Sequence, residues 1–357
     1  SVLQAHPFDF ARKVSTLDHI SRGRVAWNIV TTHLENAARN FGQDQLTPHD
    51  ERYAWAAEYV DVVYKLWEGS WDEGALLIDR ARGVFADHNK IHKIHHVGPR
   101  YRVEGPHLSA PSPQRTPLLF QAGSSGAGRQ FAAANAEGQF IVTPNPTVAA
   151  ELIRDTRRLA VATGRRAEDI KFFQGLSFII GSTEAEVRHK EAEYDEYASL
   201  DGFLAHHNYA VDRYGKPYPA DTPLAAIQSE ASQSILDWYA KSSPGTEPTV
   251  ADLGRLASRR GRVAGTPEQI ADQLELWQQA GVDGINVINW HLPGSYEEFN
   301  EHLLPVLQQR GLAKREYRPG TLRQKLFGSD RINERHPAAR YRGAFTPKTE
   351  TRNVEFA

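Results

Sequence analysis

The feature that most constrains the fold is a regular alternation between apolar runs rich in β-branched residues and segments of helical periodicity. Residues 24–32 (RVAWNIVTT), 117–122 and 170–181 are runs of the first kind. In the segments that follow them, apolar residues recur every three or four positions. This alternation is typical of βα units around a parallel sheet, so the sequence predicts an α/β fold.

The clearest helix is predicted over residues 49–70, where six apolar side chains fall at helical spacing and two acidic residues occupy the first turn. Another begins after Thr266, which suits an N-cap and is followed by a proline at the first helical position. The other predicted elements are strands over residues 1–4, 139–144 and 283–290 and helices over residues 126–137, 147–164, 183–200 and 295–311.

Two long segments interrupt the alternation. Residues 71–116 are rich in Pro, His and Gly, and we expect an excursion with a small hairpin around residues 100–108. Residues 201–249 are rich in Tyr, Pro, Ser and His and are interpreted as an insertion near one mouth of the sheet. Residues 1–314 then form one barrel domain, and the basic tail over residues 315–357 packs on the barrel or on a partner subunit.

Composition excludes several classes of function. Lys and Arg total 42 against 44 for Asp and Glu, so the net charge of −2 gives no bulk attraction for nucleic acid or anionic membranes. No run of about 18 apolar residues is present to span a bilayer. The absence of cysteine excludes disulfides and thiolate chemistry and suits a cytosolic protein.

The count of expected strands is five or six, whereas a closed barrel of βα units has eight. The sequence also contains no methionine and begins in the middle of its pattern. We therefore expect two or three further βα units to precede the first residue.

Residues 121–129 (QAGSSGAGR) join an expected strand to an expected helix. Gly123 lets the backbone approach a ligand closely, and Ser124 and Ser125 offer hydroxyls beside the positive end of the helix dipole. The glycine spacing matches neither a Walker loop nor a dinucleotide fingerprint. Two interpretations stay open, a phosphate cradle and an ordinary N-capped helix after a tight turn.

A second polar cluster follows the strand over residues 24–32, where Thr32 and His33 lie at the carboxyl end that carries ligand sites in parallel α/β folds. His49 and Tyr53 are four residues apart at a helix start, so both can face one point and donate to a phosphate. The alternative is that His49 caps the helix and Tyr53 packs.

Two groups of histidines invite further hypotheses. His92, His95 and His96 suggest a metal site, but their segment contains no acidic residue, and a solvated loop is the favoured interpretation. His206 and His207 fall where a charged helix gives way to the insertion. There, a histidine can exchange a proton with a bound ligand, or the two can form a surface pair.

Several long stretches are similar to a known family: residues 18–42, 49–71, 105–133 and 304–312. The chain resembles the flavin-dependent, luciferase-like monooxygenases of the nitrilotriacetate and dibenzothiophene sulfone type. Within that group it looks most like the long-chain alkane monooxygenase, and the stretches that carry this closer resemblance are GPHLSAPSPQRTP (105–117), GFLAHH (202–207), TLRQKLFG (321–328) and AARYRG (338–343).

The resemblance implies a (β/α)8 TIM barrel of bacterial-luciferase type with an insertion, with reduced FMN bound at the C-terminal ends of the strands. Members of the family use O2 to form a flavin hydroperoxide that oxygenates a small organic substrate. A separate NAD(P)H-dependent flavin reductase delivers the reduced flavin, and homodimers are usual.

The resemblance also implies roles for particular residues. Ser125, Tyr53 and the backbone amides around Ser124 would hold the FMN phosphate. His49 would lie in the same pocket, and His33 would lie beside the flavin.

Two further residues match positions that the family uses. Ser1, at the end of what resembles the fourth barrel strand, matches a hydroxyl position, and His206 matches a histidine over the flavin with a proton-handling or substrate-orienting role. Three alternatives stay open: a deazaflavin-dependent oxidoreductase on the same barrel, a metal-dependent barrel hydrolase that uses the histidine loop, and a flavin-binding protein without catalysis.

Overall fold

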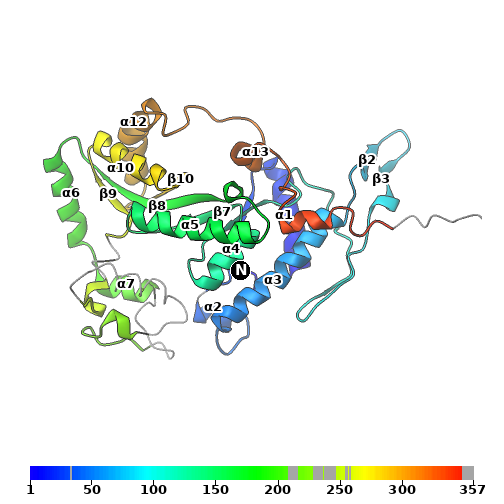
Figure 1. Ribbon diagram of the computed structural model, residues 1–357, viewed down its shortest axis with the longest axis horizontal. Coiled ribbons are helices and arrows are strands. Elements are labelled where there is room, and N and C mark those ends of the chain that lie inside the picture. Colours follow the sequence, from blue (N-terminus) through cyan, green and yellow to red (C-terminus); the bar gives the residue numbers. More distant parts are fainter. Residues whose placement is uncertain are drawn as a thin grey trace, which may run out of the picture. The chain divides into compact units, whose positions relative to one another are not determined.

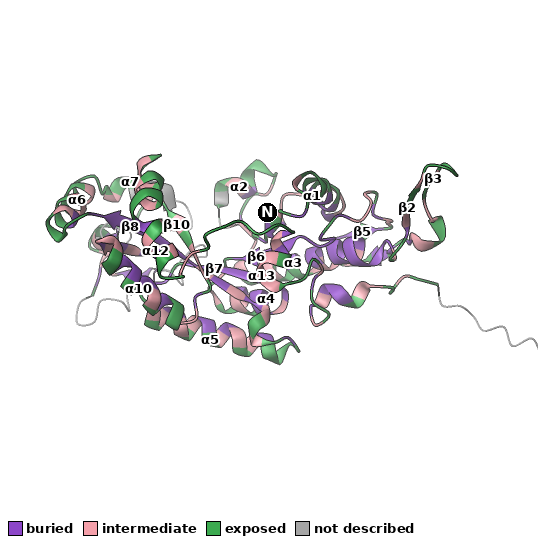
Figure 2. Ribbon diagram, turned by 90° about the horizontal axis from the view of Figure 1, so that it is seen from above, coloured by how far each residue is buried: buried purple, intermediate pink, exposed green. Residues whose placement is uncertain are grey.

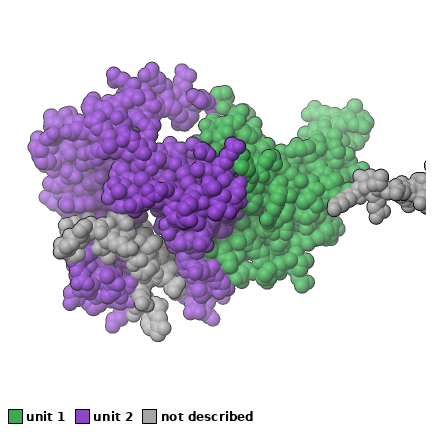
Figure 3. All heavy atoms as spheres, viewed as in Figure 1, with its two compact units in different colours: residues 1–31, 52–119, 319–357 green, residues 32–51, 120–318 purple. Residues whose placement is uncertain are grey.

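The computed structural model divides the chain into two compact units (Figure 3). Unit 1 comprises residues 1–31, 52–119 and 319–357, and unit 2 comprises residues 32–51 and 120–318. The structure describes residues 1–32, 34–207, 216–227, 236, 247–253, 256 and 259–347. Within these ranges, no helix combines the length and the apolar character needed to cross a lipid bilayer.

A parallel sheet is the centre of unit 2, and its longest strand is β8 (Lys171–Ile180) (Figure 1). Strand β8 pairs in parallel with β7, β9 and β10, and β6 pairs in parallel with β7. The strand order is β1-β6-β7-β8-β10, with β9 on β8. The predicted α/β fold with a parallel sheet is therefore confirmed. The other strands of this sheet are β1 (Ala26–Asn28) and the start of β6 (Leu118–Gln121) in unit 1, and β7 (Gly138–Ile141), β9 (Arg262–Gly265) and β10 (Gly284–Ile288) in unit 2.

The core of unit 2 lies between the sheet and its helices. Phe172 and Leu176 of β8 are fully buried and belong to one apolar cluster with Ile153 and Trp277, which come from α5 (Pro146–Ala162) and α10 (Pro267–Gln279). Figure 2 shows β7 and β8 as largely buried strands. The other helices of unit 2 are α2 (Glu35–Asn40), α4 (Gly126–Asn135), α6 (Glu184–Glu196), α7 (Leu200–His207), α11 (Gly294–Glu298), the π-helix η6 (Phe299–Leu303), α12 (Leu304–Gln309) and the short 3-10 helices η3 (Ala167–Asp169), η4 (Leu224–Ala226) and η5 (Val250–Asp252).

Helix starts in unit 2 follow the capping rules. The Thr266 side chain accepts a hydrogen bond from the Gln269 amide, which confirms the predicted N-cap. Oε1 of Gln269 accepts the Thr266 amide in turn, and the two bonds form a capping box. Thr183 caps α6 in the same way, because its hydroxyl accepts from the Glu186 amide at 3.2 Å. Local sequence therefore sets these helix boundaries.

Unit 1 is organised around aromatic side chains. Phe10 of α1 (Pro7–Ser21) lies 4.6 Å from Trp27 and 5.8 Å from Tyr59, measured between ring centroids. All six apolar residues predicted for the helix over 49–70 are buried, although α3 (His49–Tyr64) continues as the π-helix η1 (Lys65–Gly69). The other elements of unit 1 are the hairpins β2 (Leu76–Asp79) with β3 (Val84–Ala86) and β4 (His96–Val97) with β5 (Arg102–Val103), the 3-10 helices η2 (His88–Lys90) and η7 (Pro337–Tyr341), and α13 (Leu322–Phe327).

The first residues depart from the prediction. Residues 1–4 form a turn rather than the predicted strand. The Ser1 hydroxyl accepts the Leu3 amide at 3.3 Å, and helix α1 starts at Pro7 after His6, whose ring accepts the Phe8 amide. A proline at the first helical position, directly after a capping residue, is typical of a helix start. The sequence did not lead us to expect helix α1, and strand β9 was not expected either.

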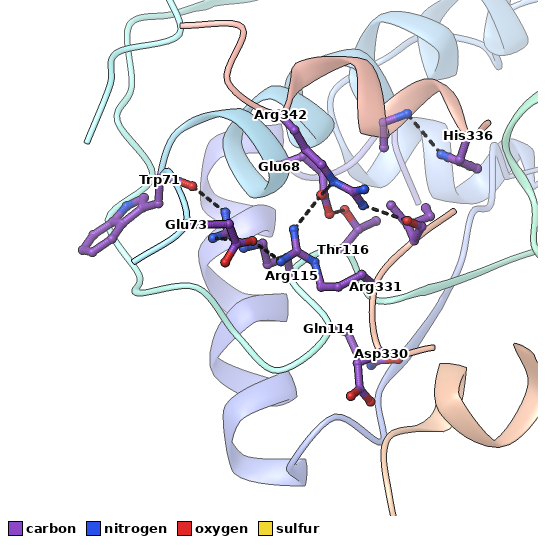
Figure 4. A network of polar contacts seen from close by, with 12 residues as sticks. Glu68, Trp71, Glu73, Gln114, Arg115, Thr116, Asp330, Arg331, His336 and Arg342 are labelled. Carbon is purple, nitrogen blue, oxygen red and sulfur yellow. Dashed lines mark hydrogen bonds and ion pairs between the residues drawn. The ribbon is translucent and has the colours of Figure 1, made fainter. Parts of the chain in front are cut away.

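A buried carboxylate fastens the C-terminal segment within unit 1 (Figure 4). Glu68 is fully shielded from solvent and accepts the Thr116 hydroxyl at 2.6 Å, Nε of Arg342 at 2.8 Å and a guanidinium nitrogen of Arg331 at 3.2 Å. Burial alone would raise the pKa of Glu68, but the charges of Arg331 and Arg342 outweigh burial and hold that pKa below its usual range. Glu68 is therefore ionised and paired.

His107 is buried in unit 1. Its Nε2 lies 2.9 Å from the Ser15 hydroxyl, and in the described part of the chain its Nδ1 has no partner. Burial, aided by the charges of Arg12 and His19, lowers the pKa of His107 to about 4. The folded protein therefore carries a neutral imidazole at this position near neutral pH.

Acidification is expected to destabilise the protein through His107. Between pH 6.5 and about 4 the unfolded chain binds a proton at His107 that the folded chain does not, so the unfolding free energy falls as the pH falls. The expected loss from this group is about 3 kcal/mol over that window. Urea unfolding at pH 7 and pH 4.5 measures it, and a His107→Gln variant is expected to show a smaller pH dependence than an exposed His95→Asn control. Equal pH dependence in the two variants would contradict this assignment.

Candidate functional site

The turn between β6 and α4 presents Ser125 at a helix N-terminus. Ser125 has the extended conformation of an N-cap, with φ −65° and ψ 168°, and its hydroxyl accepts the Gly128 amide at 3.1 Å. A Cβ added to Gly126 would have no described atom within 4 Å, so the first turn of α4 faces open space. The first amides of an α-helix have no partner within the helix and attract an anion.

His49, at the first position of α3, lies against Ser125. Its Nε2 is 3.1 Å from the Ser125 hydroxyl, and its Nδ1 is 2.7 Å from the Asp50 carboxylate. An ionised carboxylate can only accept a hydrogen bond, so the contact with Asp50 favours the neutral tautomer with its hydrogen on Nδ1. In that tautomer, Nε2 accepts a hydrogen bond from the Ser125 hydroxyl. The protonated ring would present Nε2 as a donor, with Asp50 stabilising its charge.

These groups form a site that suits a phosphate. A hydroxyl, an imidazole nitrogen and a helix N-terminus lie together, and the imidazole is about one third exposed. The hydroxyl and the helix amides can donate hydrogen bonds to an anion, and the imidazole can do so in its protonated form. Ser125 caps its helix, as one of the two interpretations of this turn predicted, and it also lies beside His49. The phosphate cradle stays a prediction.

Gly123 is held by side chains that the sequence analysis missed. The Gly123 amide donates to Oε1 of Gln121 at 2.6 Å, and the Gly123 carbonyl accepts from Nε2 of Gln139 at 3.0 Å. Both backbone polar groups of this glycine are therefore engaged. Its role is to shape the turn, while a ligand would meet the residues that follow.

The other predicted site residues include Tyr53, Ser1, His206 and His33. Tyr53 lies on α3, one helical turn after His49, and belongs to unit 1. Ser1 is exposed and also belongs to unit 1. His206 lies in α7, with its side chain outside the described part, and His33 lies outside the described residues altogether. Their roles stay predictions.

The histidine loop is not solvated as predicted. His92 and His96 are both buried, with 7% of each residue exposed, and only His95 of the three is exposed. Nε2 of His92 lies 2.8 Å from the Asp72 carboxylate, and Nδ1 of His96 lies 2.9 Å from Nζ of Lys65.

Carboxylates do accompany these histidines, contrary to the sequence-based expectation, because they come from residues distant in the chain. The carboxylate of Glu58 lies 3.4 Å from Nε2 of His96. Among the described residues, however, no group of three or more His, Cys, Asp or Glu side chains is arranged to hold a metal ion. The contacts around the loop are those of a structural network, which links α3 to the β4–β5 hairpin.

Comparison with known proteins gives consistent matches. The family model for luciferase-like monooxygenases matches residues 1–284. The dimethyl-sulfide monooxygenase of Hyphomicrobium sulfonivorans is 43% identical, over 96% of this chain and 72% of the relative. The long-chain alkane monooxygenase of Geobacillus thermodenitrificans is 39% identical, over 96% of this chain and 75% of the relative. A solved riboflavin lyase with modified FMN and riboflavin superimposes with a TM-score of 0.86 at 38% identity, covering 96% of this chain and 76% of that one.

Proposed function

The chain belongs to the luciferase-like monooxygenase family, and from this premise we propose that it is a two-component monooxygenase that uses reduced FMN and O2 to oxygenate a small organic substrate. The observation that carries the proposal is the contact between His49 and Ser125 at the N-terminus of α4, because it gathers donors suited to the phosphate of FMN. The structurally similar riboflavin lyase was solved with a modified FMN, which supports the same cofactor for this chain.

The residues present fit the phosphate end of FMN. The Ser125 hydroxyl, Nε2 of His49 and the first amides of α4 would hold the phosphate, with the amides around Ser124. Tyr53 is proposed as a further donor, since it follows His49 by one turn of α3. When bound, reduced flavin supplies the electrons that activate O2.

The other end of the cofactor is assigned by family resemblance. We propose that His33 and Ser1 lie beside the flavin ring and that His206 handles a proton or orients the substrate above it. A histidine suits this work because its charge changes near neutral pH.

The substrate is proposed only as a class. The two relatives compared are named for dimethyl sulfide and for long-chain alkanes, and the first is more similar to this chain than the second. The expected special likeness to the alkane enzyme is therefore not favoured by identity. A small organic substrate, such as an organic sulfide or an alkane, is the proposal that both relatives support.

A separate NAD(P)H-dependent flavin reductase is proposed as the electron source. The glycine spacing in residues 121–129 does not match a dinucleotide fingerprint, so the sequence offers no signature for direct reduction by a nicotinamide cofactor. A homodimer is proposed from the family resemblance.

The test of the function is oxygen incorporation. The purified chain is incubated with FMN, NADH, an added flavin reductase and 18O2, and a panel of sulfides, alkanes, sulfones and aminopolycarboxylates is screened for labelled product. We expect label in at least one member of the panel only when chain and FMN are both present. Absence of both FMN binding and labelled product would reject the proposal, and tight binding of a deazaflavin with hydride transfer would favour the alternative cofactor.

Replacing His206 by alanine is expected to reduce turnover about a hundredfold, because general acid–base groups contribute on that scale. The FMN dissociation constant is expected to stay unchanged, since the proposed phosphate site is elsewhere. His207→Ala is the matched control, and steady-state assays compare the two variants. Undiminished turnover in His206→Ala would show that His206 has no part in proton transfer.

A further inference from the structure

Two glutamines on neighbouring strands converge on one glycine. Gln121 of β6 and Gln139 of β7 are register partners in the parallel sheet, and both are buried, with 3% and 0% of the residue exposed. Gln121 accepts the Gly123 amide at 2.6 Å, and Gln139 donates to the Gly123 carbonyl at 3.0 Å. The two peptide planes that flank Gly123 are thus fixed by side chains from the sheet.

Gln139 is a poor choice for stability alone. In the described part of the chain, its buried Oε1 has no hydrogen-bond partner, which is unfavourable for folding. An apolar side chain of equal length would avoid that cost. The bond from Nε2 to Gly123 also fixes which way the amide points, so the unpaired oxygen is a direct consequence of holding the turn.

Gly123 lies two residues before Ser125, so its orientation controls where the helix begins. Ser125 must keep its extended backbone to cap α4 and to bring its hydroxyl within 3.1 Å of His49. Donors bind a charged group best when they are held in place before it arrives, because no reorganisation is then needed.

We propose that Gln121 and Gln139 are positioning residues that fix the Gly123 turn and so preorganise Ser125 and the first turn of α4 for the phosphate of the flavin. This inference rests on the proposed function, since it concerns the same phosphate site. Neither glutamine touches the phosphate. Their effect is transmitted through the backbone from Gly123 to Ser125.

The next loop of unit 2 supplies an internal comparison. Gln174 of β8 accepts both the amide and the hydroxyl of Thr143, at 3.1 and 2.9 Å, and donates to the Thr143 carbonyl at 3.0 Å. Its hydrogen bonds are satisfied, and the loop that it holds leads to α5 rather than to α4. Gln174 therefore matches Gln139 in type and burial while acting on another loop.

The test uses Gln139→Met, Gln121→Met and the control Gln174→Met in the full chain. Each variant is titrated with FMN and with riboflavin, which lacks the phosphate, and thermal unfolding is recorded. Gln139→Met is expected to lower the FMN-to-riboflavin affinity ratio about tenfold, the effect of losing roughly one hydrogen bond to the phosphate, without lowering the melting temperature. Gln121→Met is expected to lower the same ratio, whereas Gln174→Met is expected to lower the melting temperature and keep the ratio.

The outcomes separate this inference from the function on which it rests. If the wild-type chain binds FMN and riboflavin equally, the phosphate site itself is wrong, and the inference falls with it. If the wild-type chain prefers FMN and both Gln121→Met and Gln139→Met keep that preference, the positioning role is overturned while the phosphate site stands. Gln121→Met decides the matter if Gln139→Met does not fold, because it frees the same glycine from the other side.

Discussion

Replacing Ser125 by alanine is expected to weaken FMN binding by about tenfold to a hundredfold. The hydroxyl is a donor to the phosphate in our account, and a hydrogen bond to a charged group contributes roughly 1.5 to 3 kcal/mol. Riboflavin has no phosphate, so its affinity is expected to stay the same. Fluorescence titrations with the two flavins measure both effects, and adding Tyr53→Phe is expected to weaken FMN binding further.

The controls separate phosphate binding from helix capping, because Ser125 also accepts the Gly128 amide. Ser125→Thr keeps a hydroxyl at the N-cap and is expected to retain most of the FMN affinity. Thr183→Ala removes the N-cap of α6 in the same unit and is expected to cost about 1 kcal/mol of stability with no change in FMN affinity. An unchanged FMN affinity in Ser125→Ala would refute the assignment of the phosphate to this turn.

Replacing Glu68 by glutamine is expected to lower the unfolding free energy by about 3 to 5 kcal/mol. The change removes the charge of the fully buried carboxylate that the partly buried Arg331 and Arg342 share. Breaking a buried ion pair by removing one partner is strongly destabilising. Denaturant unfolding measures the loss, and limited proteolysis is expected to cut the segment after residue 319 more readily in the variant.

Glu73→Gln is the matched control, because Glu73 also pairs with Arg331 while its side chain is 77% exposed. Exposed ion pairs contribute at most about 1 kcal/mol, so this variant is expected to be close to the wild type. A loss in Glu68→Gln no larger than that in Glu73→Gln would contradict the buried-pair account.

The same carboxylate predicts a direction with pH. The pKa of Glu68 is lower in the folded protein than in the unfolded chain, so the unfolded chain takes up its proton first as the pH falls. The stabilisation by Glu68 is therefore fully present above the unfolded pKa and is lost as the pH falls through the folded pKa. His107 acts in the same direction at higher pH, so both groups favour stability near neutrality.

Patterns within a segment predicted most of the parallel sheet and the helices around the site. Strand β6, helix α4 and helix α3 were expected from local periodicity, and the Ser125 turn was singled out from its composition. Residues 1–4 were misread because a stretch of only four residues carries too little periodicity to distinguish a strand from a turn.

Contacts between distant segments were beyond the sequence. The contact of His49 with Ser125 joins residues 76 positions apart, and the partners of His92 and His96 come from 20 and 38 positions away. None of these three spacings repeats along the chain, so sequence periodicity gives no sign of the contacts. Asp50 was noticed only as an acidic residue in the first turn of a helix, although its carboxylate also sets the orientation of His49.

Binding of FMN compared with riboflavin by the unmodified full chain tests the central claim most directly, because the two flavins differ at the group that Ser125 and His49 are proposed to hold. Isothermal titration with each flavin gives the two dissociation constants. The account predicts that FMN binds at least about tenfold more tightly, as expected for one or more hydrogen bonds to its phosphate. Equal affinity for the two flavins would contradict it.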